Sequence, residues 1–143
     1  MNKLTVRRLT KLAGYLDSLP PVASKHFRML HWFKHKGKDD HPFSPSGICK
    51  KDLSYCGTSA CAAGWAATIP QFKRAGLKVD ATGDLTLNGT RGIWSSMELV
   101  EQFFGLTTRQ TSHLFGPYTK IKTPKEWAKR CRKFLREHAK DIE

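Results

Sequence analysis

The chain has 143 residues, of which 39% are hydrophobic, and its formal net charge is +13. This length and composition predict a single domain over residues 1–143 and exclude intrinsic disorder as the default. No apolar run approaches the roughly 18–20 residues that span a bilayer, and residues 1–20 lack the apolar stretch of a secretory signal. We therefore expect a cytoplasmic protein with no membrane partner.

The positive charge is concentrated at the two ends of the chain. Residues 1–38 hold nine Lys and Arg residues against one acidic residue, and residues 119–143 hold nine against four. Residues 39–118 hold seven basic and seven acidic residues, so this segment is neutral. A basic surface attracts nucleic acid, acidic proteins or anionic lipid. The alternative is a generically basic protein whose charges are only solvated.

The first helix is predicted over residues 4–18, where apolar residues recur at helical spacing: Leu9, Leu12, Ala13 and Leu16. The Pro20-Pro21 pair ends this helix. Residues 22–35 fit either a short helix or an extended segment, and their periodicity does not decide between the two. Residues 36–55 are rich in glycine, proline and charge, which predicts a long surface loop.

A second helix is predicted over residues 59–68, where nearly every side chain is small. Small side chains let other backbones approach closely, so we expect this to be the central buried helix. Pro70 stops or restarts the helix, and Gly76 closes one further turn. Residues 77–87 alternate weakly around a turn and predict one small β-hairpin.

Capping boxes, in which Ser or Thr is followed three residues later by Glu or Gln, mark three more helix starts. They are Ser95 with Glu98, Thr107 with Gln110, and Thr123 with Glu126. The third box opens a last helix over residues 124–140, whose apolar stripe consists of Trp127, Cys131, Phe134, Leu135 and His138. The predicted class is α+β and predominantly α-helical, with about five helices around helix 59–68.

Cys56 is a candidate nucleophile, because it lies just before a predicted helix. The helix dipole and free N–H groups at such a position lower a thiol pKa and favour the thiolate. The reaction also needs a base, for which His113 is the best candidate, with His41 and His138 as others. The spacing along the chain does not show that any of these histidines reaches Cys56. The alternative is that Cys56 and Cys61 are small buried side chains.

Zinc is the cofactor that the residue types permit. Its candidate ligands are His41, Cys49, Cys56 and Cys61. Their spacings match no zinc-finger pattern and the chain has no Cys-x-x-Cys, so we expect no cofactor and keep a zinc-stabilised binding module as an alternative.

Residues 97–115 have the pattern of a helix-turn-helix, with Gly105 in the turn and a second helix that carries polar side chains. Such a helix can read the DNA major groove. Glu101 and Thr111 depart from the usual residue types at their positions, and the local charge is near neutral. A plain helical corner packed on the core is therefore the alternative.

The basic ends are the strongest candidate for a binding surface, because Lys and Arg neutralise phosphates. We predict that an anionic partner contacts Arg7, Arg8, Lys11, Arg28, Lys34, Lys36, Lys38, Arg109, Lys129, Arg130, Arg132, Lys133 and Arg136.

The most specific string is Cys56-Gly-Thr-Ser-Ala-Cys-Ala-Ala-Gly-Trp65. Together with Phe27-x-Met-x-x-Trp32, Phe104-Gly-Leu-Thr107 and His113-Leu-Phe-Gly116, it resembles a family of small uncharacterised proteins of bacteria and their phages. The resemblance implies a bacterial host cell but no settled activity. By analogy, it is compatible with an inhibitor of a nucleic-acid-handling host defence system.

The function predicted from the sequence is a non-enzymatic binding protein, encoded by a phage or mobile element. Its partner is nucleic acid or an acidic, nucleic-acid-handling host protein. One alternative is a cysteine-dependent hydrolase or thiol switch centred on Cys56. The other is the zinc-stabilised module.

Overall fold

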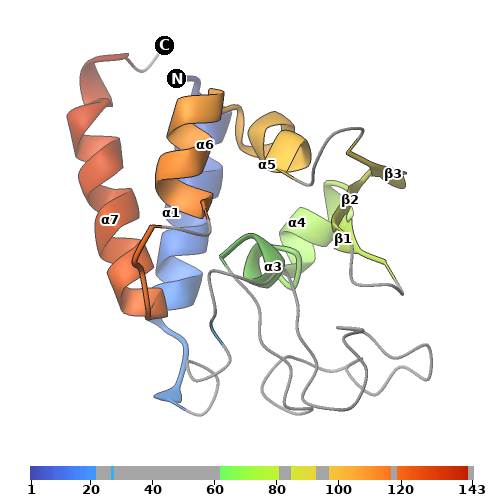
Figure 1. The fold of residues 1–143 in the computed structure, drawn as a ribbon, viewed down its shortest axis with the longest axis horizontal. Helices are drawn as coiled ribbons and strands as arrows, with labels where there is room; N and C mark the ends of the chain where they lie inside the picture. Colours follow the sequence, from blue (N-terminus) through green and yellow to red (C-terminus); the bar gives the residue numbers. More distant parts are fainter. Residues whose placement is uncertain (22–26, 28–61, 81–84, 93–96, 117–118, 142–143) are drawn as a thin grey trace.

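A computed structural model describes residues 1–21, 27, 62–80, 85–92, 97–116 and 119–141. The protein is mostly helical with one small antiparallel sheet, which confirms the predicted class (Figure 1). In chain order the elements are α1 (Lys3–Asp17), α3 (Ala62–Ala66), α4 (Pro70–Arg74), β1 (Leu77–Val79), β2 (Leu85–Leu87), β3 (Thr90–Arg91), α5 (Met97–Phe104), α6 (Thr108–Phe115), α7 (Pro124–Glu137) and a 3₁₀ turn (Ala139–Asp141).

Helices α1 and α7 lie side by side and antiparallel, with both chain termini at the same end of the pair (Figure 1). The Met1 nitrogen donates a hydrogen bond to the Asp141 carbonyl at 2.9 Å. Between the helices, the Cys131 thiol lies 3.7 Å from the Leu9 carbonyl. The buried residues of α1 include all four that the helical spacing predicts, and those of α7 include Trp127, Cys131 and Phe134. Leu135 and His138, predicted in the same stripe, are partly buried.

Helix α5 joins α6 through Gly105, whose backbone is left-handed at φ +67°. A Cβ at this position would lie 2.6 Å from the Thr5 hydroxyl, so glycine permits the N-terminal turn of α1 to approach. The Phe104 ring at the end of α5 lies against Phe72 and Phe115, with ring centroids 5.9 and 5.1 Å away. These contacts connect α5 to α4 and to α6.

Helix α3 is completely buried, as predicted for the small-residue helix, but it ends at Ala66 rather than at residue 68. The N–H groups of Thr68 and Ile69 bond three residues back, to Trp65 and Ala66, because Pro70 opens the next helix. Residues 59–61, where the helix was predicted to begin, lie outside the described residues, as do the loop 36–55 and, apart from the buried Phe27, residues 22–35.

The predicted hairpin pairs Leu77 with Leu87 in an antiparallel register. A third strand, β3, follows the Asn88-Gly89 turn and pairs with β2. Both turn residues have positive φ, 52° and 80°, as the tight turns of two-residue hairpins require. The sheet therefore has one strand more than the sequence predicts.

Two of the three predicted helix starts are described. The Thr107–Gln110 box is complete, with bonds of 3.2 and 3.0 Å. At α7, Thr123 accepts from the Glu126 N–H, but the Glu126 carboxylate accepts from the Lys122 N–H instead of completing the box. Helix α7 ends at Glu137, short of the predicted residue 140, and a 3₁₀ turn follows. The first box begins at residue 95, outside the described residues.

No helix in the described part of the chain combines the length and the apolar character needed to cross a membrane.

Candidate functional site

The strongest candidate site is an open groove of about 390 Å³ between the end of α6, the segment 119–121 and one side of α7. We call it the basic groove. It is lined by His113, Thr119, Lys120, Ile121, Glu126, Lys129, Arg130, Lys133, Phe134 and Glu137. Four of these residues are cationic and two are acidic, so the groove carries a positive excess.

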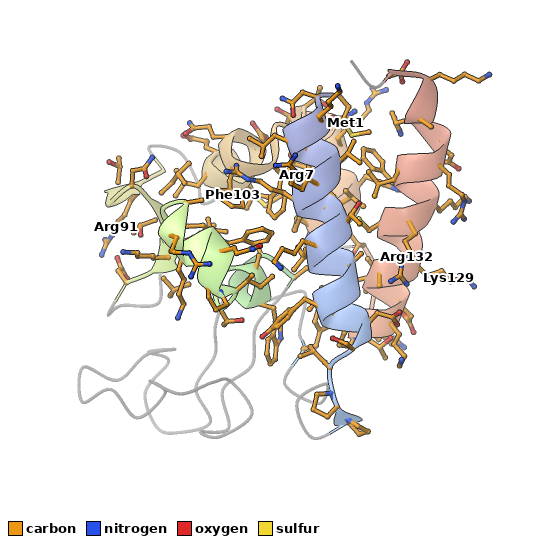
Figure 2. All side chains as sticks on the ribbon, turned by 180° about the vertical axis from the view of Figure 1, so that it is seen from behind. Met1, Arg7, Arg91, Phe103, Lys129 and Arg132 are labelled. Carbon is orange, nitrogen blue, oxygen red and sulfur yellow. The ribbon has the colours of Figure 1, made fainter. Side chains whose placement is uncertain are left out.

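The helical spacing of α7 explains how charges gather along the groove. Glu126, Arg130, Lys133 and Glu137 follow one another at i, i+4, i+7 and i+11, which places them on one face of the helix. The two cations therefore lie in the middle of this face, with a carboxylate at each end. Lys129 is exposed at the margin and extends away from the helix (Figure 2).

Bonds between α6 and α7 fix the wall of the groove. The Trp127 indole N–H donates to the Leu114 carbonyl at 2.6 Å, in a buried position. The Arg130 guanidinium donates to the His113 carbonyl at 3.2 Å. Both contacts satisfy carbonyls at the C-terminal end of α6, which lack partners within their own helix. Arg130 keeps other N–H groups that can face a ligand.

The carboxylates of the groove neutralise its cations only weakly. Glu126 already accepts the Lys122 N–H at 3.0 Å. Glu137 lies 3.8 Å from the Lys133 ammonium, and both side chains are more than half exposed. An ion pair this exposed contributes little free energy, because water screens it.

His113 packs against the cationic wall of the groove. Its ring centroid lies 6.3 Å from that of Phe134, which in turn lies 4.2 Å from that of His138. Partial burial lowers the pKa of His113, and the positive charge of Arg130 lowers it further. His138 and Lys133 act in the same direction, while Glu137 opposes them. The predicted partner of His113, Cys56, lies outside the described residues, so that pairing stays a prediction.

Two features of the segment 119–121 were missed by sequence reasoning. The Oγ1 atom of Thr119 is buried and makes no hydrogen bond within the described structure. Lys120 has a left-handed backbone with φ +64°, which side-chain-bearing residues adopt rarely. No sequence signal marks either feature. The two cations flanked by carboxylates along α7 are visible in the sequence at helical spacing and could have been found.

Arg8 and Arg132 have partners inside the protein. The Arg8 guanidinium lies 3.9 Å from the Phe103 ring centroid and donates to the Phe103 carbonyl. Arg132 and Lys125 both contact the Asp17 carboxylate, at 2.9 and 3.5 Å. The hydrogen bond from Arg132, with the nearby Lys125, lowers the pKa of Asp17. Both arginines therefore connect α1 to neighbouring helices.

The other predicted contacts fall into two groups. Arg7 and Lys11 on α1, Arg109 on α6 and Arg136 on α7 are exposed. Arg7 and Arg132 lie on the side of the α1–α7 pair that Figure 2 shows. The remaining predicted contacts, Arg28, Lys34, Lys36 and Lys38, lie outside the described residues.

The helix-turn-helix pattern folds as two helices joined at Gly105. Thr111, which departs from the usual apolar type, is buried and donates its hydroxyl to the Thr107 carbonyl at 2.8 Å. The exposed residues of α6 are Thr108, Arg109, Ser112 and His113. DNA reading by this helix stays a prediction.

Among the described residues, no group of three His, Cys, Asp or Glu side chains could hold a metal ion. The candidate zinc ligands His41, Cys49, Cys56 and Cys61 all lie outside those residues. Cys131 is buried in the core, and this burial raises its pKa to about 12.

Comparison with known proteins gives no relative from which a function could be transferred. The chain matches no protein-family model, no curated protein and no solved structure.

Proposed function

We propose that the protein is a non-enzymatic binding protein that engages nucleic acid through α7 and the basic groove. The observation that carries the proposal is the set of cations along α7 that project into solvent or into the groove. These are Lys129, Arg130, Lys133 and Arg136, and Lys120 lines the groove together with the first three. Lys and Arg in such a row can neutralise successive phosphates and release their counterions.

The composition of the surface favours nucleic acid over an acidic protein. Protein–protein interfaces depend on buried aromatic or aliphatic anchors at their centre. Within the described residues, Leu4 is the one large hydrophobic side chain that is exposed, at 47%. It lies on α1 and does not line the basic groove. The charged surface of α7 therefore offers phosphate contacts but no exposed apolar side chain for a protein partner, since Ile121 and Phe134 of the groove are buried.

Salt titration of binding tests the proposal. We would measure fluorescence anisotropy of a labelled oligonucleotide of about 20 nucleotides, in single- and double-stranded form, between 50 and 200 mM salt. We expect the logarithm of affinity to fall linearly with the logarithm of salt concentration. For duplex DNA, the triple variant Lys129→Ala, Lys133→Ala, Arg136→Ala should reduce this slope by about 2.7, because each lost phosphate contact accounts for roughly 0.9.

A matched control removes the same charge elsewhere. The variant Lys73→Ala, Arg74→Ala, Lys78→Ala changes three exposed cations on α4 and β1, on the other side of the molecule from α7 (Figure 1). It should leave most of the affinity in place. Equal losses of affinity in both variants would show that binding depends on the net charge of the protein and not on α7. The absence of any binding at 50 mM salt would refute the proposal.

The finer expectations from the sequence stay proposals. A phage or mobile-element origin, and a role in inhibiting a host defence system, rest on the resemblance and not on the groove. The cysteine-dependent hydrolase or thiol switch and the zinc-stabilised module rest on residues outside the described structure. A pull-down from host lysate, with and without nuclease, separates a nucleic-acid partner from a host protein that persists through both nuclease and salt.

A further inference from the structure

A carboxylate lies at each end of the α7 wall of the basic groove. Glu126 and Glu137 are eleven residues apart in the helix, which corresponds to roughly 16 Å along its axis. Arg130 and Lys133 lie between them on the same face. A strand of nucleic acid that followed this face would therefore meet cations only over the middle of the wall, because its phosphates at either end would lie beside a carboxylate.

The groove therefore suits one compact anion better than a series of phosphates. Its volume of about 390 Å³ is near the lower end of the roughly 300–1,000 Å³ found for small-ligand pockets. A phosphate monoester carries a charge of about −1.5 to −2 at pH 7 and three strong acceptor oxygens. A phosphodiester carries a single charge and leaves two oxygens free. The charges of Lys120, Arg130 and Lys133 in the groove match the monoester more closely.

The segment opposite α7 has two features that are common at ligand sites. Buried polar atoms are nearly always hydrogen-bonded, to protein groups or to ordered water. The Thr119 hydroxyl has no protein partner within the described residues, and Thr119 lines the groove. Lys120, beside it, has the strained backbone that clusters at ligand clamps.

We propose that the basic groove holds the terminal phosphate monoester of a nucleic-acid strand. Lys120, Arg130 and Lys133 surround the phosphate, and the Thr119 hydroxyl donates to one of its oxygens. The exposed cations at the outer margin of α7, Lys129 and Arg136, contact the diesters that follow. This inference rests on the proposed function and adds a preference for a phosphorylated strand end. The lack of exposed apolar anchors on α7 favours a strand end over a phosphorylated protein segment.

The test compares oligonucleotides of one sequence that carry a 5′-phosphate, a 3′-phosphate or hydroxyls at both ends, by fluorescence anisotropy with the label at the opposite end. We expect one phosphorylated end to bind about tenfold more tightly than the hydroxyl form, since one charge-assisted hydrogen bond contributes roughly this factor. Millimolar inorganic phosphate should abolish the preference without releasing the hydroxyl form.

Lys120→Gly is the diagnostic variant. Glycine adopts the left-handed backbone without strain, so this change removes the ammonium while the turn is kept. We expect it to lower the affinity for the phosphorylated strand far more than the affinity for the hydroxyl strand, so that the preference falls to about onefold, with an undiminished melting temperature. Thr119→Val should reduce the preference partially. Lys122→Ala, an exposed neighbour that does not line the groove, is the matched control and should retain the preference.

Each other outcome overturns the inference in a distinguishable way. Equal affinity for phosphorylated and hydroxyl ends would refute it and leave the proposed function intact. A mononucleotide that binds as tightly as the strand would assign the groove to free nucleotides. A phosphopeptide that binds more tightly than the phosphorylated strand would assign it to protein. Failure of every oligonucleotide to bind at 50 mM salt would refute the inference and the proposed function together.

Discussion

The Trp127 indole N–H and the Leu114 carbonyl form a buried hydrogen bond of 2.6 Å that joins α7 to α6. The Trp127 ring also lies 5.4 Å from the Phe115 ring, centroid to centroid. Since these helices form two walls of the basic groove, the bond couples the stability of the core to the shape of the site.

Trp127→Phe should destabilise the protein by about 1–3 kcal/mol, because it leaves a buried carbonyl without its donor and removes part of a packed ring. Urea unfolding measures this loss. The matched control is Trp65→Phe, since Trp65 is equally buried but its indole N–H makes no hydrogen bond within the described structure. The loss at Trp65 should be smaller by about the value of one hydrogen bond. Equal losses would show that the bond to Leu114 contributes nothing net.

Two glycines should respond to alanine in opposite directions. Gly105→Ala forces a side chain into a left-handed backbone and within 2.6 Å of the Thr5 hydroxyl, so we expect a loss of about 1–3 kcal/mol. Gly14→Ala lies in the interior of α1, where a Cβ meets nothing within 4 Å, and should stabilise the protein by about 0.5–1 kcal/mol. Thermal unfolding of both variants checks the signs, and the same sign for both would contradict the structure.

The local parts of the fold could be predicted from the sequence. The spacing of Leu9, Leu12 and Leu16 locates α1, and the Thr107–Gln110 box locates the start of α6, because these signals act within a few residues. Helix α3 ends earlier than predicted, because Pro70 opens the next helix. Strand β3 was not predicted, because a two-residue strand is too short to show a sequence pattern.

The candidate site was predictable only where it depends on one helix. The charges of α7 follow from helical spacing, whereas the position of Lys120 across the groove depends on packing between separate elements. Arg8 illustrates the same limit. It was predicted to contact an anionic partner, and its guanidinium lies over Phe103, a residue 95 positions away that no local pattern connects to it.

Asp17→Asn should increase the affinity for nucleic acid, because Arg132 and Lys125 lose the carboxylate that they share.

The same variant tests the ion pairs of Asp17 through the pH dependence of stability. The pKa of Asp17 is lowered in the native state, so its pairing stabilises the protein above the ordinary pKa of 3.8. This contribution is lost as the pH falls through the lower pKa of the native state. The wild type should therefore lose more stability than the variant on acidification toward pH 3. Parallel losses in thermal unfolding would argue against the pairing.

Cys131 should resist alkylation in the native protein. Burial raises its pKa to about 12, so almost no thiolate forms at neutral pH. After iodoacetamide treatment at pH 8, peptide mass mapping should find Cys131 unmodified until urea unfolds the chain. The same experiment tests the alternative enzyme hypothesis, because a nucleophilic Cys56 would react near neutral pH far faster than Cys131. Equally slow reaction of both residues would remove the basis for that alternative.

His113 should make the protein less stable as the pH falls below its ordinary pKa of 6.5. Burial and the charges of Arg130, His138 and Lys133 lower its pKa in the native state, against the opposing effect of Glu137. Between the native and the ordinary pKa, the unfolded chain binds the proton more readily, so acidification favours unfolding. His113→Gln removes this difference. Urea unfolding at pH 7, 6 and 5 should therefore show the wild type losing stability relative to the variant over this range. A constant difference at all three values would mean that the groove leaves the proton affinity of His113 unchanged.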